Sequence, residues 1–199
     1  MNARSVILSV GCCLVFFLVR AGANELPFGL SPQMGMPEVR HQLAKREFLT
    51  LNRDYSGNSR LNYDIVGEFS LSQIEIFDVD VIFVEGKIQS VILRTKTSPT
   101  VFEASQRLLR LRNFFLAQGR RKDRDDLGSI RKVSDLERKS PLVTFPGLPC
   151  EISLSTAVIQ GKPLQLIRYD VTLPTRKRSP VPSPEGSPTT PAPSIDRLR

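Results

Sequence analysis

Few residues of this chain could take part in covalent catalysis, and those few are far apart in the sequence. A cysteine nucleophile needs a histidine beside it as its base. The chain holds a single histidine, His41, which precedes Cys150 by more than half of the chain's length. Cys150 opens an alternating apolar run, which is typical of a thiol half-buried in a strand, with a reactive or dimer-forming thiol as the alternative. No nucleophile–base pair is therefore expected.

Two aspartates, Asp78 and Asp80, alternate within a β-branched run and should share one face of a strand. Such carboxylates could hold Ca²⁺ or act as an acid/base pair, but a solvent-facing strand accounts for the same spacing. Elsewhere no cluster of His, Cys, Asp and Glu has metal-ligand spacing, and no Gly-x-Ser-x-Gly motif occurs. We therefore expect no enzyme activity, no metal and no other cofactor.

Basic side chains form the best candidate binding patch. Between positions 107 and 139, Lys and Arg outnumber Asp and Glu by 11 to 5. Five of them make up the candidate patch: Arg107, Arg110, Arg120, Arg121 and Lys122. Such a patch would attract an anionic envelope polymer or a lipid surface in a salt-sensitive, weakly specific way, although a solvated helix face would carry the same residues. Nucleic acid is a poor partner because the patch lacks interleaved aromatic side chains for base stacking.

The first 23 residues have the three parts of a secretory signal peptide. Arg4 supplies the positive charge, residues 5–19 are apolar, and Ala21-Gly22-Ala23 places small residues at the −3 and −1 positions. This order predicts cleavage before Asn24 and a periplasmic or secreted protein. The apolar run is shorter than the roughly 20 residues that span a bilayer, and an uncleaved N-terminal membrane anchor is the alternative.

Cysteine usage adds two expectations. Cys12 and Cys13 lie inside the leader, so the mature chain keeps only Cys150 and has no disulfide within it. The fold must then be held by its core alone. Apolar residues continue beyond Cys12, whereas a lipidated cysteine would end the apolar segment, which argues against a lipoprotein signal.

Composition divides the chain into four segments. Residues 1–23 are the signal peptide, and residues 24–98 should form a helix plus an antiparallel β module. Residues 99–174 should form a helix, a basic loop and a β-hairpin that pack on the first module. Residues 175–199 are basic and rich in Pro, Ser and Thr, and such a segment buries too little apolar surface to fold. We expect a disordered tail, either without a role or acting as a tether whose basic residues contact an anionic surface.

Two hairpins are the clearest elements. Residues 74–84 and 87–93 are β-branched runs joined by Glu85-Gly86, with a phase change near Phe77 that indicates a bulge. The second hairpin joins residues 150–159 to residues 164–173. Its candidate core-facing residues include Ile152, Leu154, Leu166 and Tyr169.

Helical periodicity covers residues 101–118, with Thr100 as N-cap, Glu103 completing a capping box and Gly119 as the stop. A shorter helix should begin near Pro37. Together these elements predict an α+β fold in which an antiparallel sheet of hairpins packs against two helices. The repeated order of helix and hairpin hints at two degenerate α-β modules.

One stretch of the chain resembles a known family. It runs from Phe28-Gly29-Leu30 through Met34-Gly35-Met36-Pro37-Glu38-Val39 to a strand region that ends in Gly86-Lys87-Ile88. This pattern resembles the BamE/SmpA-type small envelope domain and the related tandem modules of β-lactamase-inhibitor proteins, over about residues 28–93. The resemblance implies a non-catalytic periplasmic module that binds other proteins, and it assigns no functional residue.

Export and the lack of catalytic groups favour a protein-binding or envelope-assembly module whose partners are envelope proteins. A secreted inhibitor or effector with the same scaffold is the alternative. An envelope hydrolase acting on peptidoglycan, lipid or peptide is the less favoured one.

Overall fold

The computed structural model describes residues 26–55, 59–138 and 141–172. The predicted signal peptide and C-terminal tail lie outside the described residues. The strands are β1 (Leu49–Tyr55), β2 (Arg60–Ile65), β3 (Ser70–Leu71), β4 (Ile74–Val84), β5 (Lys87–Thr95), β6 (Arg124–Asp125), β7 (Val143–Phe145), β8 (Cys150–Ile159) and β9 (Lys162–Val171). The helices are α1 (Met36–Ala44), α2 (Val101–Ala117) and α3 (Val133–Arg138), with 3₁₀ turns η1 (Pro27–Gly29) and η3 (Leu127–Ser129).

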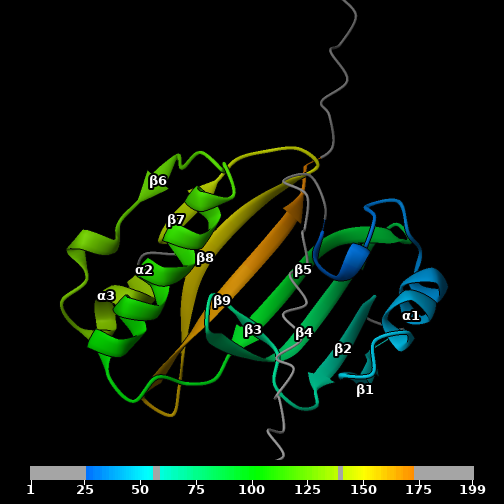
Figure 1. Cartoon of the computed structure of the whole chain (residues 1–199), viewed down its shortest axis with the longest axis horizontal. Coiled ribbons are helices and arrows are strands. Elements are labelled where there is room, and N and C mark those ends of the chain that lie inside the picture. Colours follow the sequence, from blue (N-terminus) through cyan, green and yellow to red (C-terminus); the bar gives the residue numbers. More distant parts are fainter. Residues whose placement is uncertain (1–25, 56–58, 139–140, 173–199) are drawn as a thin grey trace, which may run out of the picture.

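All of these strands belong to one antiparallel sheet. Its order is β1-β2-β4-β5-β9-β8-β7-β6, and β3 pairs with β4 off this path. The pairing of β5 with β9 joins the two predicted hairpins side by side. In Figure 1 the sheet crosses the molecule, with α1 beside the β1–β2 end and α2 and α3 at the β7–β8 end.

The expected α+β class is wrong, because the described residues form nine strands against three short helices and the fold is predominantly antiparallel β. The sequence pattern had indicated both hairpins and the longest helix. It missed β3, β6 and β7, because strands of two or three residues are too short to show a period. The predicted division near residue 98 falls in the linker between β5 and α2 and stays a prediction.

The two hairpin turns explain why these strands pair locally. Glu85 and Gly86 both have positive φ, 51° and 74°, and so do Gln160 and Gly161, at 51° and 73°. Two central residues in this left-handed region match a type I′ turn, whose twist suits a two-residue hairpin. The predicted bulge is also confirmed, since the β4–β5 register shifts between Ile76 and Asp78.

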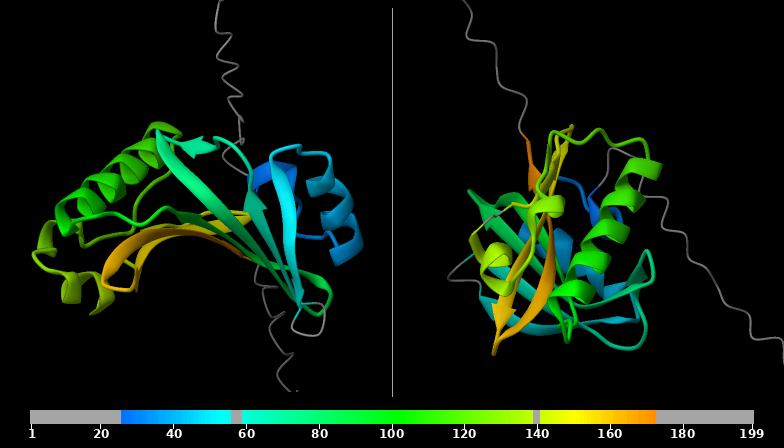
Figure 2. Two further views of the ribbon diagram at one scale, coloured as in Figure 1. Left: turned by 90° about the horizontal axis from the view of Figure 1, so that it is seen from below. Right: turned by 90° about the vertical axis from the view of Figure 1, so that its left-hand side faces the viewer.

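One face of the sheet is apolar and covered. An aligned row of buried side chains crosses it from β2 to β7: Tyr63, Val79, Leu93, Ile167, Leu154 and Val143. A parallel row lies beside it: Leu61, Val81, Val91, Tyr169, Ile152 and Phe145. Figure 2 shows α1 and α2 on the same side of the strongly arched sheet. Both helices contribute to the single core cluster that includes these rows.

Helix α2 presents one buried side to this face. Thr100 caps it by accepting a hydrogen bond from the Glu103 amide at 3.1 Å, as the sequence predicted. Its buried residues are Ala104, Leu108, Leu111 and Phe115. The centroid of the Phe115 ring lies 5.4 Å from that of the Phe145 ring and 6.3 Å from that of the Tyr169 ring. Phe115 therefore anchors the helix to β7 and β9.

A buried polar cluster fixes the start of α2 against β9. Thr95 donates to the Gln165 side-chain oxygen at 2.7 Å, and the Gln165 backbone amide donates to Thr95 Oγ1 at 3.0 Å. The Gln165 side-chain nitrogen donates to Ser98 Oγ at 3.2 Å. All three residues are fully buried, and their side-chain polar groups satisfy one another.

We expect Phe115→Ala to lower the free energy of unfolding by about 3–5 kcal/mol, because it empties a packed aromatic site. Phe102→Ala, on the same helix, is the matched control, since Phe102 is 73% exposed. It should change stability by less than about 0.5 kcal/mol. Urea unfolding followed by circular dichroism measures both, and equal losses for the two variants would contradict the packing described above.

Candidate functional site

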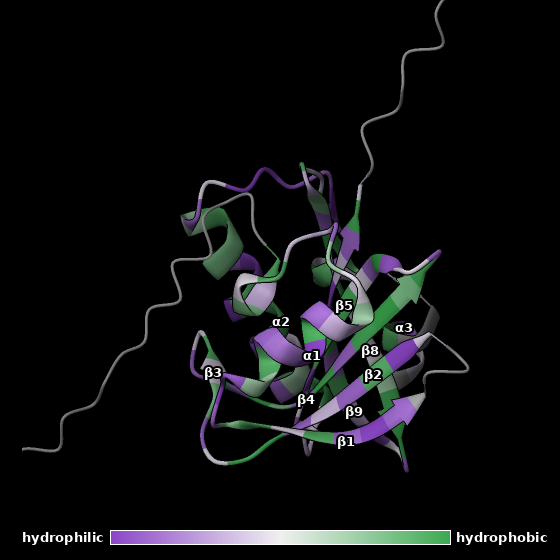
Figure 3. Cartoon of the chain, turned by 90° about the vertical axis from the view of Figure 1, so that its right-hand side faces the viewer, coloured by the Kyte–Doolittle hydropathy of each residue, from purple (hydrophilic) through white to green (hydrophobic). Residues whose placement is uncertain are grey.

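The opposite face of the sheet carries neither α1 nor α2 (Figure 2). Most of the side chains aligned on it are polar. One aligned row on it runs from β2 to β7: Asn62, Asp80, Ile92, Arg168, Ser153 and Thr144. The next row runs from β2 to β8: Asp64, Asp78, Arg94, Leu166 and Ser155. Figure 3 shows hydrophilic residues along β1 and β2. We call this surface the uncovered face.

The β2–β4–β5 part of the uncovered face is an ion-pair network centred on Asp80. Asp80 is 0% exposed, and it accepts hydrogen bonds from Arg60 Nε at 2.8 Å and from Asn62 Nδ2 at 3.0 Å. Arg94 forms ion pairs with both Asp80 and Asp78. Burial alone would lower the pKa of Arg94, but the hydrogen bonds and charges of the two aspartates outweigh it and raise that pKa.

This network decides the chemistry of the aspartate pair. Asp78 and Asp80 do share one face, as their spacing predicted. The expected solvent exposure is wrong for Asp80, because its partners from β2 and β5 cover it. Both carboxylates are engaged by guanidinium and amide donors, so their arrangement serves to hold three strands in register. The described residues include no group of three or more His, Cys, Asp or Glu side chains that could hold a metal ion.

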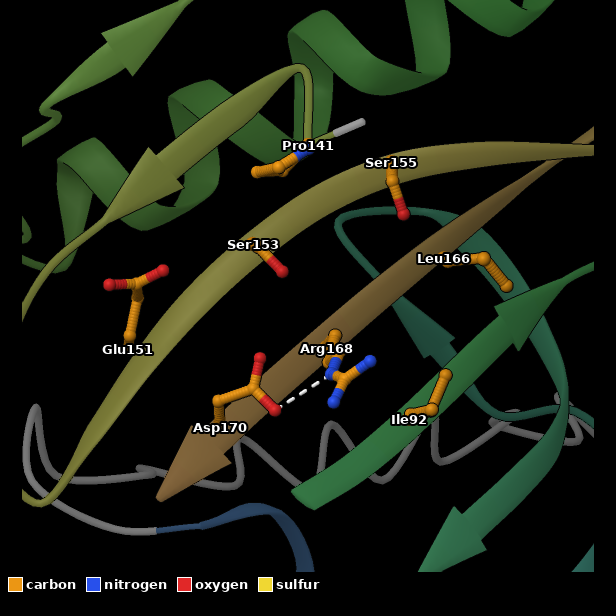
Figure 4. A pocket seen from close by; sticks show the side chains of 8 residues that line it. All are labelled: Ile92, Pro141, Glu151, Ser153, Ser155, Leu166, Arg168 and Asp170. Carbon is orange, nitrogen blue, oxygen red and sulfur yellow. Dashed lines mark hydrogen bonds and ion pairs between the residues drawn. The ribbon is translucent and has the colours of Figure 1, made fainter. Parts of the chain in front are cut away.

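The β5–β9–β8 part of the uncovered face has a hollow of about 310 Å³. Its lining residues are Ile92, Pro141, Glu151, Ser153, Ser155, Leu166, Arg168 and Asp170. Figure 4 shows Glu151, Ser153 and Ser155 following one another along β8, with Asp170, Arg168 and Leu166 opposite them along β9. Arg168 Nε donates to Asp170 Oδ1 at 2.7 Å. Leu166 was expected in the core and instead forms part of this hollow.

The five residues of the predicted basic patch do not form one compact cluster. Arg107 pairs with Glu103 and donates to the Lys96 carbonyl at 2.8 Å. From Arg107 to the end of α2 the helix rises about 15 Å, and only beyond that end do the patch's last three residues follow: Arg120, Arg121 and Lys122.

Two further patch residues have internal partners, whereas Arg110 and Arg121 are exposed. Arg120 donates to the Cys150 carbonyl at 3.3 Å, and Lys122 donates to Asp125 at 2.8 Å. Burial would raise the pKa of Asp125, but hydrogen bonds from Lys122, the Leu127 amide and Arg112 lower it. A binding role for the patch stays a prediction.

Cys150 lies fully buried at the start of β8, with Arg120 against it. A side chain at Gly147 would collide with the Arg120 guanidinium, so glycine there lets the arginine reach the strand. Burial raises the pKa of the Cys150 thiol despite the nearby Arg120 charge. His41 is exposed on α1, which lies at the opposite end of the sheet. The two residues therefore cannot act together.

Among the described residues, none of the helices is both long and apolar enough to cross a membrane.

No protein-family model matches this chain, and comparison with curated proteins and with solved structures gave no match. The resemblance to the BamE/SmpA-type domain and to β-lactamase-inhibitor modules therefore stays a proposal.

We expect Asp80→Ala to lower the free energy of unfolding by about 3–5 kcal/mol, because it leaves two arginines without their shared buried partner. Asp64→Ala is the matched control on the same face. Asp64 is half-buried and accepts a hydrogen bond from Asn52 at 2.9 Å, and its loss should cost about 1 kcal/mol or less. Chemical denaturation measures the difference, and an Asp80→Ala variant as stable as the control would contradict a structural role for the network.

Cys150 should react slowly with a thiol reagent in the native protein, because it is buried and its raised pKa lowers the thiolate fraction. In the chain from Asn24 onward it is the one cysteine. We expect labelling at pH 8 to be on the order of a hundredfold or more slower than in urea, since it requires the strand to open. Equal rates in both states would show an accessible thiol.

Proposed function

We propose that this chain is an exported, non-catalytic protein-binding module of the cell envelope, and that it binds its partner through the uncovered face of the sheet. The observation that carries this proposal is the alignment of polar side chains from β2 to β8 on a face that neither α1 nor α2 covers. An extended sheet surface of this kind presents its side chains at fixed positions. It can therefore match one protein surface without reorganising.

The internal chemistry of the face supports binding rather than turnover. The carboxylates of Asp78 and Asp80 are held by arginine and asparagine donors. The Cys150 thiol is buried, so it offers no nucleophile to a substrate. A face whose charges are largely paired within the chain stays folded and polar without a ligand. These points weigh against the envelope hydrolase.

The export part of the proposal rests on the signal-peptide pattern of residues 1–23. The family resemblance over residues 28–93 supports the same module type. A secreted inhibitor or effector would use the same face against a soluble target, so the two readings differ only in where the partner is found.

A photo-cross-linking amino acid in place of Thr50 or Arg168 tests the proposal, because both positions lie on the uncovered face. In the full chain expressed in its native host, both should yield the same discrete protein adduct in the envelope fraction. The matched control is the same amino acid in place of Gln106, an exposed residue of α2. N-terminal sequencing of the recovered chain should start at Asn24.

Three other outcomes of this experiment would overturn or change the proposal. The same adduct from Gln106 alone would move the binding surface to the helices and overturn the proposal. A chain that keeps Met1 and stays in the cytosol would remove the export part. An adduct recovered from the culture medium with a soluble target would favour the inhibitor or effector.

A further inference from the structure

The hollow between β5, β9 and β8 differs from the ion-pair network because three of its polar side chains, Glu151, Ser153 and Ser155, have no partner among the described residues. Ser153 and Ser155 are only 7% and 8% exposed, and their hydroxyls make no hydrogen bond with the described residues. Neither hydroxyl oxygen is among the buried side-chain atoms that lack a partner, so both oxygens are accessible from the hollow. Both side chains line the hollow, as Figure 4 shows, so a partner would reach them from there.

The charge inside the hollow is negative. Asp170 is engaged by Arg168, whereas the Glu151 carboxylate has no ion pair with any described residue. Two carboxylates against one guanidinium leave one net negative charge. Glu151 and Asp170 are register neighbours on β8 and β9, so both carboxylates lie at the same end of the hollow.

The opposite end and the walls are apolar. Leu166 is the register neighbour of Ser155, and Ile92 is the neighbour of Arg168 from β5. Pro141 completes the lining on the β7 side. The hollow thus changes from apolar to acidic along the strands, with the two serine hydroxyls in between.

We propose that this hollow receives an arginine or lysine side chain of the protein that docks on the uncovered face. The inference rests on the proposed function and names the chemistry of its partner. The aliphatic part of such a side chain would pack against Leu166, Ile92 and Pro141. Its cationic head would donate to Glu151 and to the serine hydroxyls, which can accept hydrogen bonds.

The size of the hollow agrees with this occupant. Its volume of about 310 Å³ is at the lower end of the roughly 300–1,000 Å³ of ligand pockets, which leaves room for one long side chain. In the β2–β4–β5 part of the face, Asp78 and Asp80 are already paired with Arg94.

The test uses the peptide acetyl-Ala-Ala-Arg-Ala-Ala-amide and its counterparts with lysine, norleucine or glutamate in place of arginine. Each is titrated into the ¹⁵N-labelled full chain and followed by NMR. The arginine or lysine peptide should shift the amide resonances of Glu151, Ser153 and Ser155 in a saturable, salt-sensitive way. The norleucine and glutamate peptides should not.

Glu151→Gln should weaken this binding about tenfold or more, because it removes the charge that strengthens the hydrogen bond. Glu85→Gln is the matched control, since Glu85 is exposed in the β4–β5 turn and lies outside the hollow. It should leave binding unchanged, and thermal unfolding of both variants confirms that they fold. Equal binding by both variants, or binding of the norleucine peptide as tight as that of the arginine peptide, would overturn the inference.

Two further outcomes separate this inference from the proposed function. If the adduct from position 50 forms equally well in the Glu151→Gln chain, the partner docks but places no basic side chain in the hollow. If neither the adduct nor peptide binding is observed, both proposals fail. If the peptide binds only after Arg176→Ala, Lys177→Ala and Arg178→Ala are combined, the chain's own basic segment is the occupant and the partner assignment is wrong.

Discussion

The antiparallel pairing of β5 with β9 is the contact on which both faces of this protein depend. It places Val91 opposite Tyr169 and Leu93 opposite Ile167, so the apolar rows of the two hairpins become continuous. The same register places Ile92 beside Arg168 and builds the hollow on the other side. Because side chains alternate along a strand, a slip of one residue would exchange the two faces of one hairpin.

The buried cluster around Thr95 and Gln165 holds this register at one end of the pairing. Its hydrogen bonds join residues that are 70 positions apart in the chain. The Ser98 backbone amide adds a bond to the Pro163 carbonyl at 2.6 Å, which ties the linker before α2 to β9. The apolar face can then be covered by α1 and α2, whereas neither helix covers the polar face.

Local pattern located the two long hairpins, α2 and its Thr100 cap, because turn chemistry, capping and hydrophobic period act between near neighbours. The same reasoning misplaced Leu166, which looks like a core residue by type. Its neighbours Ile167 and Tyr169 take the core phase of β9, and a period of two leaves Leu166 on the other face. The polar residues at alternate positions 151, 153 and 155 share one face of β8, and this alternation was the sequence pattern that could have indicated the hollow.

The basic patch shows the limit of counting charges along the chain. Three residues of this one basic stretch have separate partners in the structure. Arg107 pairs with Glu103, Arg120 donates to the Cys150 carbonyl, and Lys122 pairs with Asp125. The amino-acid sequence by itself determined the hairpins and the longest helix, because these depend on residues close together. Tertiary structure alone decided the strand order, the burial of Asp80 and the lack of an ion-pair partner for Glu151 among the described residues, because each depends on strands that meet only when the sheet closes.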